Sequence, residues 1–314
     1  MTPLAFAALA LVHGVLVLLM PIVLTGVINR TKSWWAGRKG PRLLQLASDL
    51  RRLLYKRPVV SVVASPLFRS GAWVVLVCNL LAAAMSPMLG PFAPLQFAYD
   101  FIAVAYTLGL ARLALMVSAM DVGSSFEGMG AAREAGFSAF AEPALFLLFG
   151  TLLAATGLTS FAGLIGHLHR TPYYLLVVAP LAFALLVLLQ TEAARVPVDD
   201  PLTHLELTMI HEVMILDHSG PELAAMQYAA GLKMTLYAGL LAALLNPLDV
   251  YAEPFAATLA SIGLMLLVAC VVGCIEALTA RLAMRWVPRY VLLAAAAALL
   301  GMLLVWRAAG GAGR

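Results

Sequence analysis

Residues 192–222 hold the densest group of side chains that can bind and release protons. Seven of the sixteen Asp and Glu residues and three of the six His residues lie in this segment. They are Glu192, Asp199, Asp200, Glu206, Glu212, Asp217 and Glu222, together with His204, His211 and His218. A solvated loop could carry the same residues as ordinary charges. Because an acid-rich segment between two apolar stretches costs free energy unless it meets a partner or moves a proton, we interpret it as functional.

The three histidines are spaced by seven residues. On a continuous helix this spacing separates neighbours by roughly 10 Å, which is too far for one metal ion. The pattern therefore indicates no mononuclear metal site. Proton relay, hydrogen bonding at an interface and capping of local backbone all stay open, since imidazole titrates near neutral pH. Thr203 and Glu206 predict a capping box that begins a short helix.

Long apolar stretches must position these side chains. Of the 314 residues 63% are hydrophobic and 11% charged, whereas about a quarter of an ordinary soluble chain is charged. A membrane-spanning helix takes roughly 20 apolar residues. Eight stretches qualify, at about 4–28, 72–90, 95–119, 142–160, 173–194, 223–245, 255–280 and 289–307. The sequence therefore predicts an all-α integral membrane protein, a single membrane domain over 1–314 with about eight transmembrane helices.

Lys and Arg gather in alternate connections between these stretches. With their flanks, the loops at about 29–71, 120–141, 195–222 and 281–288 hold 17 of the 20 basic residues. Positive loops stay in the cytoplasm, so we predict a multi-pass protein of the cell inner membrane with its N-terminus outside. The net charge of +4 then reflects topology. We expect a lipid bilayer and a soluble cytoplasmic partner, and no nucleic acid.

Four carboxylates fall inside or at the ends of the predicted spans. Glu142 and Glu192 are expected at the cytoplasmic ends of the fourth and fifth spans, Glu276 within the seventh and Asp100 near the start of the third. Ionisable groups at such depth usually face a polar interior or a partner. Glu192 and Arg195, three residues apart, could pair on one helix face, which would give Glu192 a structural role. A proton-carrying role is the alternative.

The basic stretch 29–58 contains a predicted cytoplasmic amphipathic helix. Its defining residues are the apolar Leu43, Leu46 and Leu50 and the basic Arg51, Arg52 and Lys56. Such a helix is typical of a segment lying on the membrane surface, and one wall of a membrane-level cavity is the alternative. Cys270 and Cys274 share a helix face, but a metal cluster needs about four thiolates. We therefore interpret them as packing residues.

The segment RVPVDDPLTHLELTMIHEVMILDHSGPEL (195–223) closely resembles the loop between the fifth and sixth spans of the membrane-anchor subunits of formate hydrogenlyase and hydrogenase-4, the group 4 membrane-bound nickel–iron hydrogenases. Residues 37–56 and 126–146 resemble two further regions of these subunits. The wider family includes the H subunit (subunit 1) of respiratory complex I. The glutamate, arginine and proline-plus-acid pattern of that subunit is matched by Glu192, Arg195, Pro197 and Asp199.

The resemblance implies a subunit of an oxidoreductase complex that is not catalytic alone. Such a subunit docks an iron–sulfur small subunit and a nickel–iron-type large subunit on the cytoplasmic side, and it lies beside antiporter-like membrane subunits. The iron–sulfur clusters and the nickel–iron centre are expected on those partners, with no cofactor or metal bound by this chain. The implied proton-path residues are Glu142, Glu192, Glu206, Glu212, Asp199 and His211. The implied docking residues are Arg195, Asp200, His204, Asp217 and His218.

The second half of the loop departs from the complex I pattern. His204, His211 and the DHSGP run replace a more acidic, aromatic run, which argues against a ubiquinone chamber of that form. Two alternatives stay open: a quinone-site anchor subunit of a complex I-type NADH dehydrogenase, and a stand-alone ion transporter. The transporter would use Glu142, Asp100 and Glu276 as ion ligands and would be supported by inverted repeats, which the sequence does not show.

Overall fold

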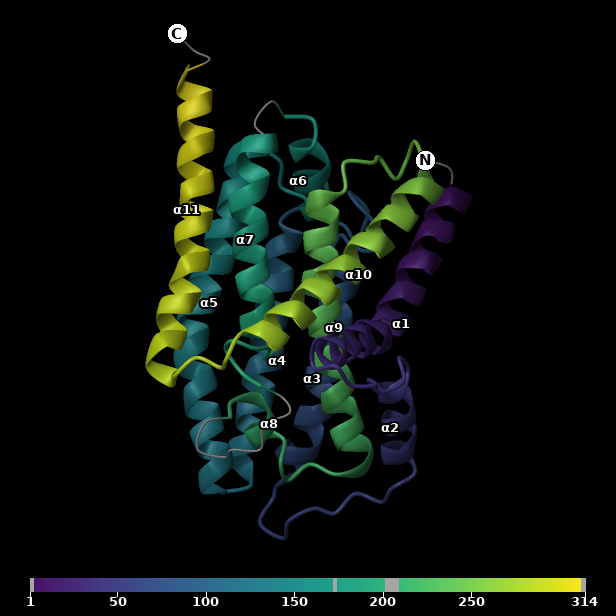
Figure 1. Cartoon of the computed structure of the whole chain (residues 1–314), viewed down its shortest axis with the longest axis vertical. Helices are drawn as coiled ribbons and strands as arrows, with labels where there is room; N and C mark the ends of the chain where they lie inside the picture. Colours follow the sequence, from purple (N-terminus) through teal and green to yellow (C-terminus); the bar gives the residue numbers. More distant parts are fainter. Residues whose placement is uncertain (1–2, 172–173, 201–208, 312–314) are drawn as a thin grey trace.

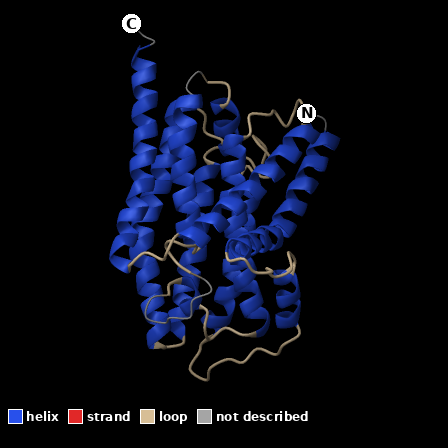
Figure 2. Cartoon of the chain, viewed as in Figure 1, coloured by secondary structure: helices blue, strands red, loops and turns tan. Residues whose placement is uncertain are grey.

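The computed structural model describes residues 3–171, 174–200 and 209–311. Within these ranges every regular element is a helix and there is no strand (Figure 2). Eight helices are long and apolar enough to cross a membrane. They are α1 (Pro3–Trp35), α3 (Pro66–Met85), α4 (Asp100–Asp121), α5 (Ser125–Thr156), α7 (Tyr174–Glu192), α9 (Gly220–Leu245), α10 (Pro254–Leu278) and α11 (Val287–Gly311). The predicted all-α membrane fold is thus confirmed.

Helix α9 forms the centre of the bundle. Of its most apolar 18-residue window 78% is buried, against at most 44% in the other seven candidate spans. A helix that is apolar on all sides must be surrounded by other helices, and α9 packs against α1, α3, α7 and α10. Helix α11 packs against α5 and α7 at one edge of the bundle (Figure 1). The connection from the end of α7 to the start of α9 therefore begins and ends beside the core.

The fourth span begins earlier than predicted. Helix α5 starts at Ser125, so residues 125–141, expected in a cytoplasmic loop, form the first half of a 32-residue helix. This half is rich in Ala, a strong helix former, but too mixed in Gly, Glu and Arg to register as an apolar run. Glu142 consequently lies in the middle of a helix, and its predicted position at a span end is wrong. Glu192 ends α7, as predicted.

The predicted amphipathic helix is confirmed as α2 (Gln45–Leu54). It packs against α9 and α1 and runs along the long axis of the molecule (Figure 1). This direction differs from the flat one expected for a helix lying in the membrane plane. Leu46 and Leu50 are half-buried, while Leu43, just before the helix, and the basic Arg51, Arg52 and Lys56 are exposed. Contact of α2 with lipid stays a prediction.

Three shorter elements complete the described chain: α6 (Phe161–Leu168), α8 (His211–Met214) and the 3-10 helix η1 (Met284–Trp286). The capping box predicted at Thr203 and Glu206 lies outside the described residues. Because α8 ends after four residues, His211 and His218 do not lie two turns apart on one helix. The roughly 10 Å separation derived from a continuous helix therefore does not apply to this pair.

Candidate functional site

A buried arginine gathers three carboxylates from two other helices. Arg112 on α4 is only 4% exposed. Its guanidinium forms ion pairs with Glu134 and Glu142 on α5 and with Glu192 at the end of α7. The pair with Glu134 joins Nε to Oε1 over 3.2 Å. A guanidinium has five N–H donors in a fixed plane, so one arginine can bind several carboxylates at once.

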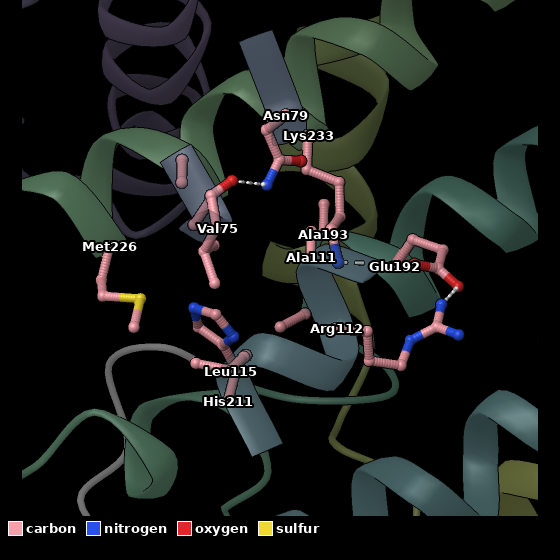
Figure 3. Close-up of a pocket in the computed structure, with 13 residues that line it drawn as sticks. Val75, Asn79, Ala111, Arg112, Leu115, Glu192, Ala193, His211, Met226 and Lys233 are labelled. Carbon is pink, nitrogen blue, oxygen red and sulfur yellow. Dashed lines mark hydrogen bonds and ion pairs between the residues drawn. The ribbon is translucent and has the colours of Figure 1, made fainter. Parts of the chain in front are cut away.

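Glu192 lies between two cations. Nζ of Lys233 on α9 lies 3.5 Å from one of its carboxylate oxygens, and Arg112 donates to the other (Figure 3). The glutamate side chain is 5% exposed and the lysine side chain 12%. We name Arg112, Glu134, Glu142, Glu192 and Lys233 the Arg112 cluster. With three carboxylates and two cations it carries one surplus negative charge when fully ionised, and in a low-dielectric interior such a surplus favours binding of a proton.

Two small cavities touch the Arg112 cluster. One of about 20 Å³ is lined by Arg112, Glu192, Lys233 and His211, among others, and Figure 3 shows the His211 ring beside it. The second, of about 10 Å³, is lined by cluster residues and Asp199. A water molecule needs roughly 10–15 Å³ and several polar partners. Each cavity therefore has room for about one water in contact with a carboxylate.

A larger cavity of about 240 Å³ lies against the loop after α7 and shares lining residues with both smaller cavities. Asp199, His211, Arg195 and Glu212 line it. His211 also lines the 20 Å³ cavity, and Asp199 also lines the 10 Å³ cavity. Its other wall includes Leu46 and Asp49 of α2. Helix α2 thus forms part of a cavity wall, and the position of this cavity at the level of the membrane stays a prediction. Asp199 and His211 stand where the loop meets the Arg112 cluster.

Asp199 organises the loop around this junction. It is 1% exposed, and one of its carboxylate oxygens accepts hydrogen bonds from the backbone N–H groups of Ile210 (3.1 Å) and His211 (2.9 Å). The other oxygen pairs with Arg281 at 3.0 Å. Burial raises the pKa of Asp199, and these hydrogen bonds and the guanidinium oppose that rise. The carboxylate thereby fixes His211 over the cavity.

His211 is an imidazole that lines both the 20 Å³ and the 240 Å³ cavity. Burial, with the nearby cations Lys233 and Arg195, lowers its pKa from 6.5 to about 4. Its Nε2 is buried and has no hydrogen-bond partner within the described part of the chain. A neutral imidazole can accept a proton at one nitrogen and donate from the other. The geometry therefore suits transfer between the large cavity and the Arg112 cluster.

Arg195 takes part in a second buried group. The carboxylate of Glu276 on α10 is fully buried and lies 2.9 Å from Lys32 of α1 and 3.5 Å from Arg195. The alternative pairing of Glu192 with Arg195 is therefore wrong, because each side chain pairs elsewhere. At 9% exposure Arg195 presents little surface for a soluble partner.

His218 is also internal. It is 3% exposed and stacks on Phe68 with ring centroids 3.9 Å apart. Its Nε2 lies 3.1 Å from the Ser118 hydroxyl, and burial lowers its pKa to about 4. Asp217, by contrast, is exposed, and Asp200 and Glu212 are half-buried. Partner docking through these residues stays a prediction, and the predicted His204 and Glu206 lie outside the described residues.

The three acids proposed for an ion transporter do not meet. Glu142 pairs with Arg112, Glu276 pairs with Lys32, and an Asp100 oxygen accepts the backbone N–H of Phe161 at 2.6 Å. Asp100 thus caps the start of α6. Across the ranges described above, no group of three or more His, Cys, Asp or Glu side chains could hold a metal ion.

Sequence reasoning missed Arg112, Glu134 and Lys233. Arg112 and Lys233 are charges inside predicted apolar spans, and the cost of burying a charge there is a usable signal. Glu134 could not be found in the same way, because the sequence predicts a loop for its segment.

Known membrane proteins resemble this chain both in sequence and in fold. Residues 7–306 match the NADH dehydrogenase family. Hydrogenase-4 component C of Escherichia coli (strain K12) is 28% identical over 242 residues, 76% of this chain and 75% of the relative. Formate hydrogenlyase subunit 4 of the same organism is 25% identical over 228 residues, 71% and 72% respectively. A chain of the membrane-bound sulfane sulfur reductase, an archaeal respiratory membrane complex, has the same fold, with a TM-score of 0.81 at 18% identity over 96% of this chain and 99% of that one.

Proposed function

Because the chain belongs to the NADH dehydrogenase family of complex I-related membrane subunits, we propose that this multi-pass membrane protein is the anchor and proton-coupling subunit of a membrane-bound hydrogenase or formate hydrogenlyase complex. The two relatives from Escherichia coli support the finer assignment. The observation that carries the coupling role is the Arg112 cluster, which surrounds a buried arginine, has a surplus carboxylate and contacts two cavities that residues of the loop after α7 also line.

The proposed partners follow from this assignment. An iron–sulfur small subunit and a nickel–iron-type large subunit dock at the end of the bundle that holds the 195–222 loop, and antiporter-like subunits lie beside the helices. The redox cofactors are held by those partners. We place this end in the cytoplasm and the N-terminus outside, because the loops at this end hold most of the Lys and Arg.

The path runs from the loop inward. A proton in the large cavity meets His211, whose pKa of about 4 leaves it neutral near pH 7 and able to pass a proton on. Glu192 is the next protonatable group, since both residues line the 20 Å³ cavity. From Glu192 the proton passes to Glu142, because the Arg112 guanidinium, which itself stays protonated, holds both carboxylates. The Glu142 side chain is 51% exposed on α5. That exposed carboxylate is the exit toward a membrane partner.

The size of the large cavity favours a proton path over a quinone site. Small-molecule sites usually measure roughly 300–1,000 Å³, whereas this cavity measures about 240 Å³. Its lining is also charged, with Arg195, Asp199 and Glu212. A quinone ring in this cavity would displace water from those charged side chains, which costs free energy.

The test is a Glu192→Gln variant of the intact complex, reconstituted in vesicles. We expect the redox activity and the subunit composition to persist while proton translocation falls at least about tenfold, since a positioned proton-transfer group typically contributes about 10²–10⁴-fold. Glu206→Gln is expected to act in the same direction. Glu253→Gln, an exposed site at the start of α10, is the matched control. Unchanged translocation in both loop-side variants would refute the coupling role, and copurification of a flavin-bearing NADH module with quinone would refute the hydrogenase assignment.

A further inference from the structure

A second region of the molecule has the chemistry of a ligand site. A cavity of about 590 Å³ lies between the last turns of α1, the turn at 36–44 and one face of α10. Its lining shares no residue with the cavities that reach the Arg112 cluster. Thr25 and Asn29 of α1 face the larger of those cavities, and Arg30 and Trp34 face this one.

Three basic side chains surround the cavity without an acidic partner. Arg30, Arg38 and Lys39 line it, and no carboxylate of the described residues forms an ion pair with any of them. The neighbouring Lys32, by contrast, is neutralised by Glu276 at 2.9 Å. Three uncompensated positive charges around one hollow favour an anion.

Backbone contacts fix the turn that carries Arg38 and Lys39. Helix α1 ends in a tight turn, in which the N–H groups of Gly37 and Arg38 donate to the carbonyls of Trp34 (3.0 Å) and Ser33 (2.9 Å). Gly37 has a φ of 63°, the left-handed conformation that glycine adopts readily at a helix end. At Gly40 a Cβ would lie 3.0 Å from the Ser33 Cβ, so the absence of a side chain lets the turn fold against α1.

The remaining walls are apolar and lie at the end of two candidate spans. Val27, Leu43 and Cys270 line the cavity on this side. Trp34 is 74% exposed at its mouth, and tryptophan is enriched where a membrane meets water. A soluble anion would gain nothing from these walls, whereas acyl chains would bury them.

We propose that this cavity binds an anionic phospholipid, with the phosphate between Arg30, Arg38 and Lys39 and the acyl chains along α1 and α10. Basic pockets between transmembrane helices recognise lipid head groups in this way. The inference does not depend on the proton-coupling role, because it uses none of the residues of the Arg112 cluster.

The test uses quenching of tryptophan fluorescence by brominated lipid. The full chain is reconstituted in phosphatidylcholine vesicles with increasing mole fractions of either dibrominated phosphatidylglycerol or dibrominated phosphatidylcholine, in two matched series. Subtracting the signal of a Trp34→Phe variant isolates Trp34 from the other four tryptophans. We expect dibrominated phosphatidylglycerol to quench Trp34 at concentrations about tenfold lower than dibrominated phosphatidylcholine. Equal quenching by the two lipids would overturn the proposal.

Two variants with equal charge changes separate the site from general attraction. The triple change Arg30→Gln, Arg38→Gln and Lys39→Gln should remove the preference for phosphatidylglycerol. The matched triple change Arg51→Gln, Arg52→Gln and Lys56→Gln on and just after α2 should leave it intact. Equal loss in both would show a non-specific surface charge effect and refute the site. Displacement of the lipid signal by millimolar inorganic phosphate or glycerol 3-phosphate would show that the pocket takes a free phosphate, which also refutes a lipid site.

Discussion

Removing Arg112 should destabilise the fold strongly, because it leaves buried carboxylates without their main counter-charge. The change is Arg112→Met, which keeps the length of the side chain and removes its charge. Losing one partner of a buried ion pair costs about 3–5 kcal/mol. Here Lys233 still lies 3.5 Å from Glu192, and the Glu142 side chain is 51% exposed to its surroundings. We therefore expect a loss of about 2–4 kcal/mol in the free energy of unfolding.

A second change identifies the origin of that loss. If the destabilisation comes from the uncompensated charge on Glu192, adding Glu192→Gln to Arg112→Met should restore about half of it, since a neutral amide costs less to bury than a carboxylate. Arg52→Met is the matched control. Arg52 pairs with Asp49 at 3.7 Å, but its side chain is 72% exposed, and such surface pairs contribute about 0–1 kcal/mol.

The assay is equilibrium unfolding in mixed detergent micelles, by titration with sodium dodecyl sulfate and far-ultraviolet circular dichroism. All four proteins are compared at one pH and one detergent concentration. A single variant Arg112→Met as stable as the parent would refute the charge argument. A double variant that is less stable than Arg112→Met alone would also refute the charge argument, because removing the charge of Glu192 would then not have restored stability.

Two further predictions concern pH and packing. The pKa of His211 is about 4 in the fold against an ordinary value of 6.5. Lowering the pH from about 6.5 to 4 should therefore destabilise the protein, because the unfolded state binds a proton that the folded state does not. His211→Gln should make the denaturation midpoint less dependent on pH, and an unchanged pH dependence would contradict this. Gly71→Ala should lower the free energy of unfolding by about 1–3 kcal/mol through overpacking, because the new Cβ would lie 2.7 Å from the Ser118 Cβ. Gly150→Ala is the control, since its Cβ would meet nothing within 4 Å outside its own stretch of helix. Its melting temperature in detergent should stay within a few degrees of that of the parent.

The spans could be predicted from the sequence because bilayer thickness fixes their length and apolarity. That rule fails where a helix is long but not apolar. The first half of α5 contains Arg133 and Glu134 among alanines and glycines, so hydropathy assigns it to a loop although its helix propensity is high. The misplacement of Glu142 follows directly from that error. The position of Glu192 at the end of α7 was predictable because the apolar run stops there.

The Arg112 cluster could be predicted only in part. A sequence shows that a charge is buried but not which residue neutralises it. Arg112 meets Glu142 and Glu192 across separations of 30 and 80 residues, and Lys233 meets Glu192 across 41. Only the packing of α4, α5, α7 and α9 brings them together. The i,i+3 spacing of Glu192 and Arg195 suggested a nearer partner, but α7 ends at Glu192, so the helical face that would pair them does not continue.

A buried acid in a membrane helix is thus no sign of proton transfer by itself, and what it contacts decides its role. Asp100 and Glu192 both lie at helix ends in predicted spans. Asp100 accepts a hydrogen bond from the backbone N–H of Phe161, a donor that cannot change its charge, so it fixes the start of α6. Glu192 instead pairs with Lys233, shares Arg112 with two further carboxylates and lines a cavity that His211 also lines. Of the two, only Glu192 therefore has the surroundings that the proposed proton path requires.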